Sequence, residues 1–86
     1  MAKVKESSKK FKLIEASRTE MFKIGSMGIC DHCNEVTKEG VYIAVLNHWT
    51  CKECFEEWHE RAVHYGEDMY IEEQNFKAYK EVLKAK

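Results

Sequence analysis

The chain has 86 residues, a length that allows one domain and only a small hydrophobic core with a thin margin of stability. Its content of 44% hydrophobic and 12% aromatic residues excludes the aromatic-poor, strongly charged composition of a disordered protein. The formal net charge of −1 combines a basic start, +4 over residues 1–28, with an acidic remainder, −5 over residues 29–86.

The sequence predicts an unexported, cytoplasmic protein without a membrane segment. No apolar run reaches the roughly 18 to 20 residues that cross a bilayer, and no apolar segment of a secretory signal follows the lysine-rich start. Disulfides are disfavoured in a reducing cytosol, so paired cysteines there more often indicate metal or redox chemistry.

The first part of the chain is predicted to be a basic arm, residues 1–27. Residues 1–8 read as a solvated tail. Phe11, Ile14, Arg18 and Met21 form a partial helical stripe, which favours a helix over residues 9–24, although short strands around residues 17–19 also fit. A hinge over residues 25–28 then leads into the predicted zinc-binding domain, residues 28–86.

A hairpin and two helices are predicted in that domain. Residues 41–46 favour a strand, and residues 47–48 turn the chain into a short strand at 49–50. A helix follows from residue 51 to a stop at Gly66, with one apolar face made of Phe55, Trp58, Ala62 and Tyr65. A second apolar stripe predicts a terminal helix over about residues 71–83, packed against the first.

The strongest motif is the pair of cysteine pairs, Cys30-x2-Cys33 and Cys51-x2-Cys54, separated by 17 residues. This spacing is typical of a four-thiolate zinc site, and we predict one Zn²⁺ per chain. A helix that begins at the second pair would stabilise its thiolates. Two disulfides in a secreted protein, redox thiols and an iron–sulfur cluster remain alternatives. A four-thiolate zinc has no open position for water, so we expect no enzyme activity.

The order of these elements resembles the treble-clef zinc fingers, including the first half of LIM-type modules. The resemblance rests on residues 30–33, 41–45 and 49–55 and covers about residues 28–65. It implies a small, metal-stabilised α+β fold with a zinc knuckle, a β-hairpin and a helix, joined here by a C-terminal helix and an N-terminal basic arm. No second ligand set follows the helix, so the chain departs from a full LIM domain.

The four histidines offer weaker motifs. His59-Glu60 and His64 suggest the metalloprotease HExxH helix, but the second histidine comes one residue late and would face about 140° away. His48 could replace one cysteine as a ligand, although four cysteines already satisfy the ion. His32 lies inside the first cysteine pair and is expected to be exposed.

These features predict a non-enzymatic, zinc-stabilised module that binds another protein, as a small regulator or inhibitor with an acidic and aromatic surface. The default position of its aromatic residues is the core. The candidate partner-binding residues are Trp49, Trp58, Glu53, Glu56, Glu57 and Glu60. The alternative is a nucleic-acid-binding zinc finger that uses Lys9, Lys10 and Lys12, although an acidic helix argues against it. The sequence leaves the oligomeric state undecided.

Overall fold

A four-stranded antiparallel sheet with a helix on each face organises the chain. The structure is a computed structural model that describes residues 2–25 and 27–84. The strands follow one another in space as they do in the sequence: β1 (Lys3–Glu6), β2 (Lys12–Ser17), β3 (Glu39–Ile43) and β4 (His48–Thr50). The helices are α1 (Arg18–Lys23), α2 (Lys52–Arg61) and α3 (Met69–Leu83), with a 3₁₀ turn, η1 (Gly66–Asp68), between the last two.

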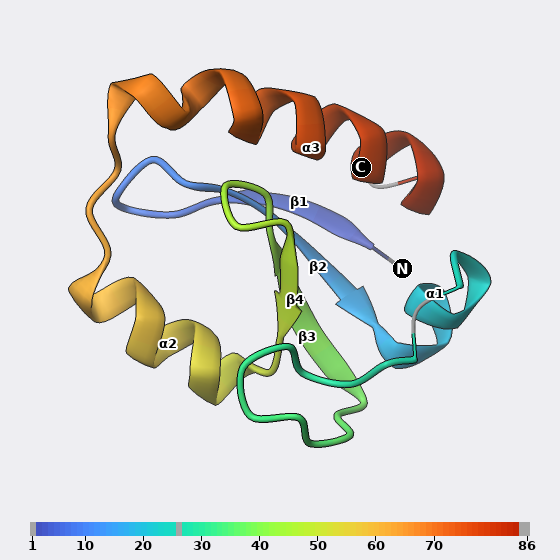
Figure 1. Cartoon of the computed structure of the whole chain (residues 1–86). Coiled ribbons are helices and arrows are strands. Elements are labelled where there is room, and N and C mark those ends of the chain that lie inside the picture. Colours follow the sequence, from blue (N-terminus) through green and yellow to red (C-terminus); the bar gives the residue numbers. More distant parts are fainter. Residues whose placement is uncertain (1, 26, 85–86) are drawn as a thin grey trace.

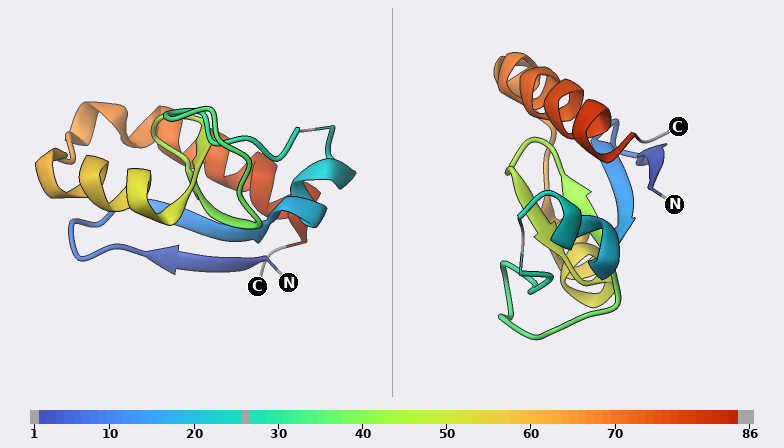
Figure 2. Two further views of the ribbon diagram at one scale, coloured as in Figure 1. Left: turned by 90° about the horizontal axis from the view of Figure 1, so that it is seen from below. Right: turned by 90° about the vertical axis from the view of Figure 1, so that its right-hand side faces the viewer.

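Both faces of the sheet are buried, by different helices. Successive strand residues point to opposite faces, so Leu13 and Ile43 pack with Trp58 of α2, whereas Ile14 and Tyr42 pack with α3. Figures 1 and 2 show the sheet lying between these two helices. A strand covered on both sides needs an uninterrupted apolar run, which explains the sequence Val-Tyr-Ile-Ala-Val at residues 41–45.

The N-terminal residues form strands, not the solvated tail and helix predicted for them. Lys3–Glu6 pairs with Lys12–Ser17, which in turn pairs with β3 in the register Leu13↔Ile43. The helical stripe over residues 9–24 was misleading because β2 is buried on both faces and its apolar residues therefore do not alternate. Only α1 is helical there, and it begins at a capping box in which Ser17 and Glu20 exchange hydrogen bonds.

The predicted helix after the second cysteine pair is confirmed, but it is shorter than expected. Phe55, Trp58 and Ala62 share one apolar face as predicted, and this face packs against the sheet. The helix ends at Arg61, because Ala62 adopts an extended backbone with ψ 145°. Tyr65, the fourth residue of the predicted stripe, therefore lies beyond the helix and is 55% exposed.

The predicted terminal helix is also present, as α3, but it does not pack on α2 as expected. Its apolar stripe, Phe76, Tyr79 and Leu83, joins the core on the opposite face of the sheet. The ring of Tyr79 stacks on Tyr42, with the ring centroids 4.0 Å apart. In the part of the chain that the structure describes, neither α3 nor any other helix has the length and apolar character needed to cross a membrane.

A lysine from the β1–β2 turn closes the C-terminal end of α2. The ammonium group of Lys9 donates hydrogen bonds to the carbonyl oxygens of His59, Glu60 and Ala62, the last two at 3.0 Å. The last carbonyls of a helix lack partners within the helix and carry partial negative charge. This one side chain therefore ties the N-terminal hairpin to the helix that carries the second cysteine pair.

Replacement of Lys9 by Met should lower the free energy of unfolding by about 1.5–3 kcal/mol, the range for hydrogen bonds to a charged group. Methionine keeps most of the length of the side chain but cannot donate to the three carbonyls. Chemical denaturation of the protein, followed by far-UV circular dichroism, measures the loss. Lys10→Met, an exposed change in the same turn, is the matched control. An equal loss in both variants would contradict the role of Lys9.

Candidate metal centre

Four cysteine sulfurs gather at one end of the sheet. The Sγ atoms of Cys30, Cys33, Cys51 and Cys54 all lie within 4.8 Å of one another, and those of Cys33 and Cys51 are 3.9 Å apart. All four residues carry free thiols. Among the described residues, this is the one group of three or more potential His, Cys, Asp or Glu ligands that lies so close together. The four cysteines could hold one metal ion.

The first cysteine pair lies in a tight knuckle. An isolated bridge between Ile29 and Val36 closes this loop, and Asn34 reverses the chain with φ 62°, a left-handed conformation that asparagine tolerates better than most residues. The N–H groups of His32 and Cys33 point at the sulfur of Cys30, at 3.4 and 3.5 Å. A loop of this shape presents two sulfurs and several N–H groups to the same point.

The second cysteine pair opens α2. Cys51 is the N-cap residue, with an extended backbone, and its carbonyl accepts the first helical hydrogen bond from the N–H of Phe55 at 2.9 Å. Cys54 follows in the first turn, so the chain turns its sulfur back toward that of Cys51. The positive end of the helix dipole lies at these two residues and favours thiolates there.

The two cysteine pairs are held together by residues other than cysteine. The N–H of Asp31 donates to the carbonyl of Trp49, and the N–H of Trp49 donates to the carboxylate of Asp31, both at 3.0 Å. These two hydrogen bonds fix the knuckle against β4, which leads directly to Cys51. Sequence reasoning missed the role of Asp31, because nothing in the chain near residue 31 indicates a partner at residue 49.

The sulfurs differ in how readily they ionise. Burial opposes ionisation of Cys30, but the N–H groups of Cys33, Cys51 and His32 outweigh it and lower the pKa of this thiol to about 6. The pKa of Cys54 is raised, first by the hydrogen bond that its thiol shares with Cys51 and then by burial. Thiolates this close together repel one another, so a cation bound among them would favour the ionised form of all four.

The two tryptophans near the cysteines belong to the core rather than to an open surface. Trp49 is 3% exposed, and its indole N–H donates to the carbonyl of Ala16 at 3.2 Å. Trp58 is half-buried and packs on Phe11, with ring centroids 4.7 Å apart. The core was the default prediction for both. The acidic candidates lie on the outer side of α2, and all are exposed: Glu53, Glu56, Glu57 and Glu60.

The three lysines of the alternative function lie in the β1–β2 hairpin. Lys9 is engaged with the carbonyls at the end of α2. Lys12 is half-buried, and its ammonium group lies 5.5 Å from the centre of the Phe76 ring. Lys10 is exposed in the turn. No local pattern could have shown the role of Lys9, since its partners lie about 50 residues away.

The histidines of the protease-like motif take part in packing. His59 and His64 both contact the ring of Phe11, and Nε2 of His64 lies 3.2 Å from the buried carboxylate of Glu72. His48 lies outside the four-cysteine group, and its Nδ1 is 3.3 Å from Nε2 of His32. The predicted exposure of His32 is confirmed.

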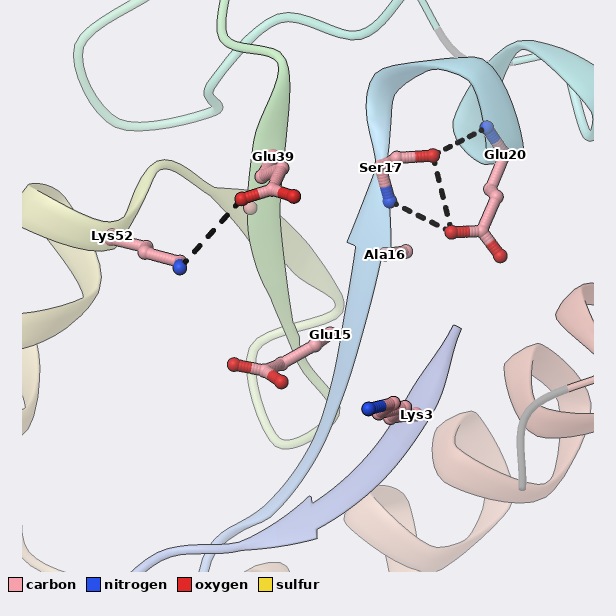
Figure 3. Close-up of a pocket in the computed structure, with 8 residues that line it drawn as sticks. Lys3, Glu15, Ala16, Ser17, Glu20, Glu39 and Lys52 are labelled. Carbon is pink, nitrogen blue, oxygen red and sulfur yellow. Dashed lines mark hydrogen bonds and ion pairs between the residues drawn. The ribbon is translucent and has the colours of Figure 1, made fainter. Parts of the chain in front are cut away.

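A separate polar hollow lies beside β2 and β3 (Figure 3). Its three carboxylates already have partners. Glu39 lies 3.8 Å from Lys52, Glu15 lies 3.3 Å from Lys5, and Glu20 belongs to the capping box of α1. Because these carboxylates are already engaged within the chain, the cysteine cluster is the better candidate site.

Comparisons with known proteins add no relative: no family model, no curated protein and no solved structure matches the chain. The four-cysteine cluster therefore carries the functional argument by its own geometry.

Proposed function

We propose that the chain is a treble-clef-like zinc domain that binds another protein and has no enzyme activity of its own. One observation carries the proposal: four sulfurs from a knuckle and a helix N-terminus lie within 4.8 Å of one another. The order of knuckle, β3–β4 hairpin and α2 resembles that of a treble clef, which supports the proposal, and the first two strands and α3 would extend this unit.

Zinc fits the donor set better than magnesium or calcium does. Four thiolates at about 2.3 Å from a tetrahedral zinc ion lie about 3.8 Å apart, and the sulfurs of Cys33 and Cys51 are 3.9 Å apart. Soft thiolates select zinc, copper(I) or iron–sulfur clusters over magnesium or calcium. The N–H groups around the sulfur of Cys30 and the helix N-terminus at Cys51 together stabilise the negative charge that zinc would neutralise.

A zinc ion with four protein thiolates would be structural. Catalytic zinc sites keep one position for water or substrate, whereas this donor set fills all four. The site would instead link the knuckle to α2 and so stabilise a chain with a small core.

The outer side of α2 is the surface that supports protein binding. It carries four exposed carboxylates, at residues 53, 56, 57 and 60. Arg61 is the one lysine or arginine between positions 53 and 73. Such a surface complements a basic partner and raises the rate of its association. The expected ligand is therefore a protein with an exposed basic patch. It would bind to α2, whose position the zinc would stabilise.

Charge reversal on α2 tests this function. We expect Glu56, Glu57 and Glu60 changed to Lys to abolish capture of a partner that the wild-type chain retains from cell extract, because the three ammonium groups would repel a basic surface. Quantitative mass spectrometry of the captured proteins, after nuclease treatment, measures the difference. Zinc content and circular dichroism confirm that the variant is folded.

The matched control changes three exposed glutamates elsewhere, Glu67, Glu73 and Glu81, to Lys. It alters the net charge by the same amount and leaves the α2 surface intact. Equal loss of the partner in both variants would mean that net charge alone controls capture. Loss of capture after nuclease treatment would favour nucleic acid as the ligand.

A further inference from the structure

Two histidines beside the cysteine cluster face each other across the knuckle and β4. Nε2 of His32 and Nδ1 of His48 are 3.3 Å apart, and the ring centroids are 5.4 Å apart with the ring planes at 87°. Two neutral imidazoles at this distance share one hydrogen, which one ring donates and the other accepts. A metal ion can take the place of that hydrogen if both nitrogens reach it.

The separation of the two nitrogens suits one ion. A zinc ion bound to nitrogen at about 2.0–2.1 Å holds two tetrahedral ligand nitrogens about 3.3–3.4 Å apart. An octahedral ion with bonds of this length needs about 3.0 Å between neighbouring ligands. A small rotation of the two side chains would bring the nitrogens to that separation. The observed 3.3 Å lies within reach of both geometries.

The backbone around both histidines is fixed. His48 is paired with Ile43 in the sheet, and His32 lies in the knuckle. The two neighbours of these histidines, Asp31 and Trp49, are joined by a reciprocal pair of hydrogen bonds. The chain therefore holds the two rings together without a metal. Metal binding would then cost little side-chain entropy, because the two histidines are already ordered.

We propose that His32 and His48 form a second metal site, open to solvent, that takes one first-row transition-metal ion such as Ni²⁺ or Zn²⁺. Imidazole nitrogen is a preferred ligand for these ions. His32 is exposed and His48 is half-buried, so water can complete the coordination. The site thus keeps the open positions that the four-cysteine cluster lacks. The proposal does not depend on which metal the cysteines hold.

The test titrates the zinc-loaded, tag-free protein with Ni²⁺, whose mass and paramagnetism distinguish it from an ion at the cysteines. We expect one Ni²⁺ per chain by native mass spectrometry, retention of the zinc, and selective broadening of the amide NMR signals near residues 32 and 48. Mutation of residues that only hydrogen-bond to metal ligands typically lowers metal affinity about 10–100-fold. Loss of one ligand, in His32→Gln or His48→Gln, should therefore weaken Ni²⁺ binding at least about tenfold.

The matched control is His59→Gln, which removes a histidine outside the pair and should leave Ni²⁺ affinity unchanged. Circular dichroism and zinc content verify the fold of each variant. Three results would overturn the proposal: no saturable Ni²⁺ binding, equal binding in the variants of the pair and in the control, or release of one zinc for each Ni²⁺ taken up.

Discussion

Removal of the metal should unfold most of this chain. Structural zinc contributes about 10–16 kcal/mol of apparent binding free energy in zinc-finger peptides, whereas a whole small domain has a net stability of about 5–15 kcal/mol. The cysteine cluster joins the knuckle to β4 and α2, and without the ion its four sulfurs would be left to repel one another or to take up protons. We expect a strong chelator to remove the helical signal in far-UV circular dichroism and the cooperative thermal transition.

Native mass spectrometry before and after chelation gives the identity and stoichiometry of the metal, which should be one zinc per chain at the four cysteines. Cys30→Ser should reproduce the effect of the chelator, because it replaces the most buried of the four ligands. Glu35→Ser, an exposed change in the same knuckle, should keep both metal and fold. A metal-free chain with an unchanged spectrum and transition would refute a structural metal.

Replacement of Trp49 by Ala should lower the free energy of unfolding by about 3–5 kcal/mol, the range for deletion of a large aromatic core residue. The indole ring is 3% exposed, and it lies so close to Gly40 that a Cβ there would come within 2.8 Å of the ring. The change would also leave the carbonyl of Ala16 without the hydrogen bond from the indole. Denaturant unfolding of the zinc-loaded protein measures the loss.

Trp58→Ala is the comparison, because Trp58 is half-buried and packs at the edge of the other core cluster. It should cost clearly less stability. Trp49→Phe, which keeps a six-membered aromatic ring but loses the five-membered ring with its N–H, should fall between the two. If Trp49→Ala were as stable as Trp58→Ala, Trp49 would not be the anchor of the core that its burial indicates.

The clustering of the four cysteines could be predicted from the sequence because the signal for it is local. Each cysteine pair spans four residues. The first pair was expected in a knuckle and the second at the start of a helix, and the structure places them there. The β3–β4 hairpin and the two later helices also follow from local patterns of turn residues and apolar spacing. In each of these elements the spacing of apolar residues can be recognised within about a dozen residues of sequence.

The N-terminal strands could not be predicted in the same way. Leu13 and Ile14 are both buried, one on each face of the sheet, because β2 lies between β1 and β3 and under α3. The partner that creates this environment, Ile43, is 30 residues away from Leu13 in the sequence. Because distant residues bury both faces of β2, its apolar residues do not alternate as they would in a half-exposed strand. A helical spacing therefore fitted the same residues equally well.

The same long-range dependence explains the misplaced packing of α3. Its apolar stripe was visible in the sequence, but the stripe does not say which apolar surface it covers. With the N-terminal residues taken as an arm, α2 was the one large surface left. Once β2 completes the sheet, a whole face remains to be covered, and Phe76 and Tyr79 pack there.

The reciprocal hydrogen bonds between Asp31 and Trp49 also protect an edge of the sheet. Exposed edge strands are templates for pairing with another molecule, and proteins commonly block them with charge or with a covering loop. On β4, Asp31 occupies the outward N–H and carbonyl of Trp49. On β1, Lys3 and Lys5 supply charge at the opposite edge. The knuckle thus serves as an edge cover as well as a ligand loop, and loss of the metal should leave β4 open to aggregation, which light scattering of the chelated protein would register.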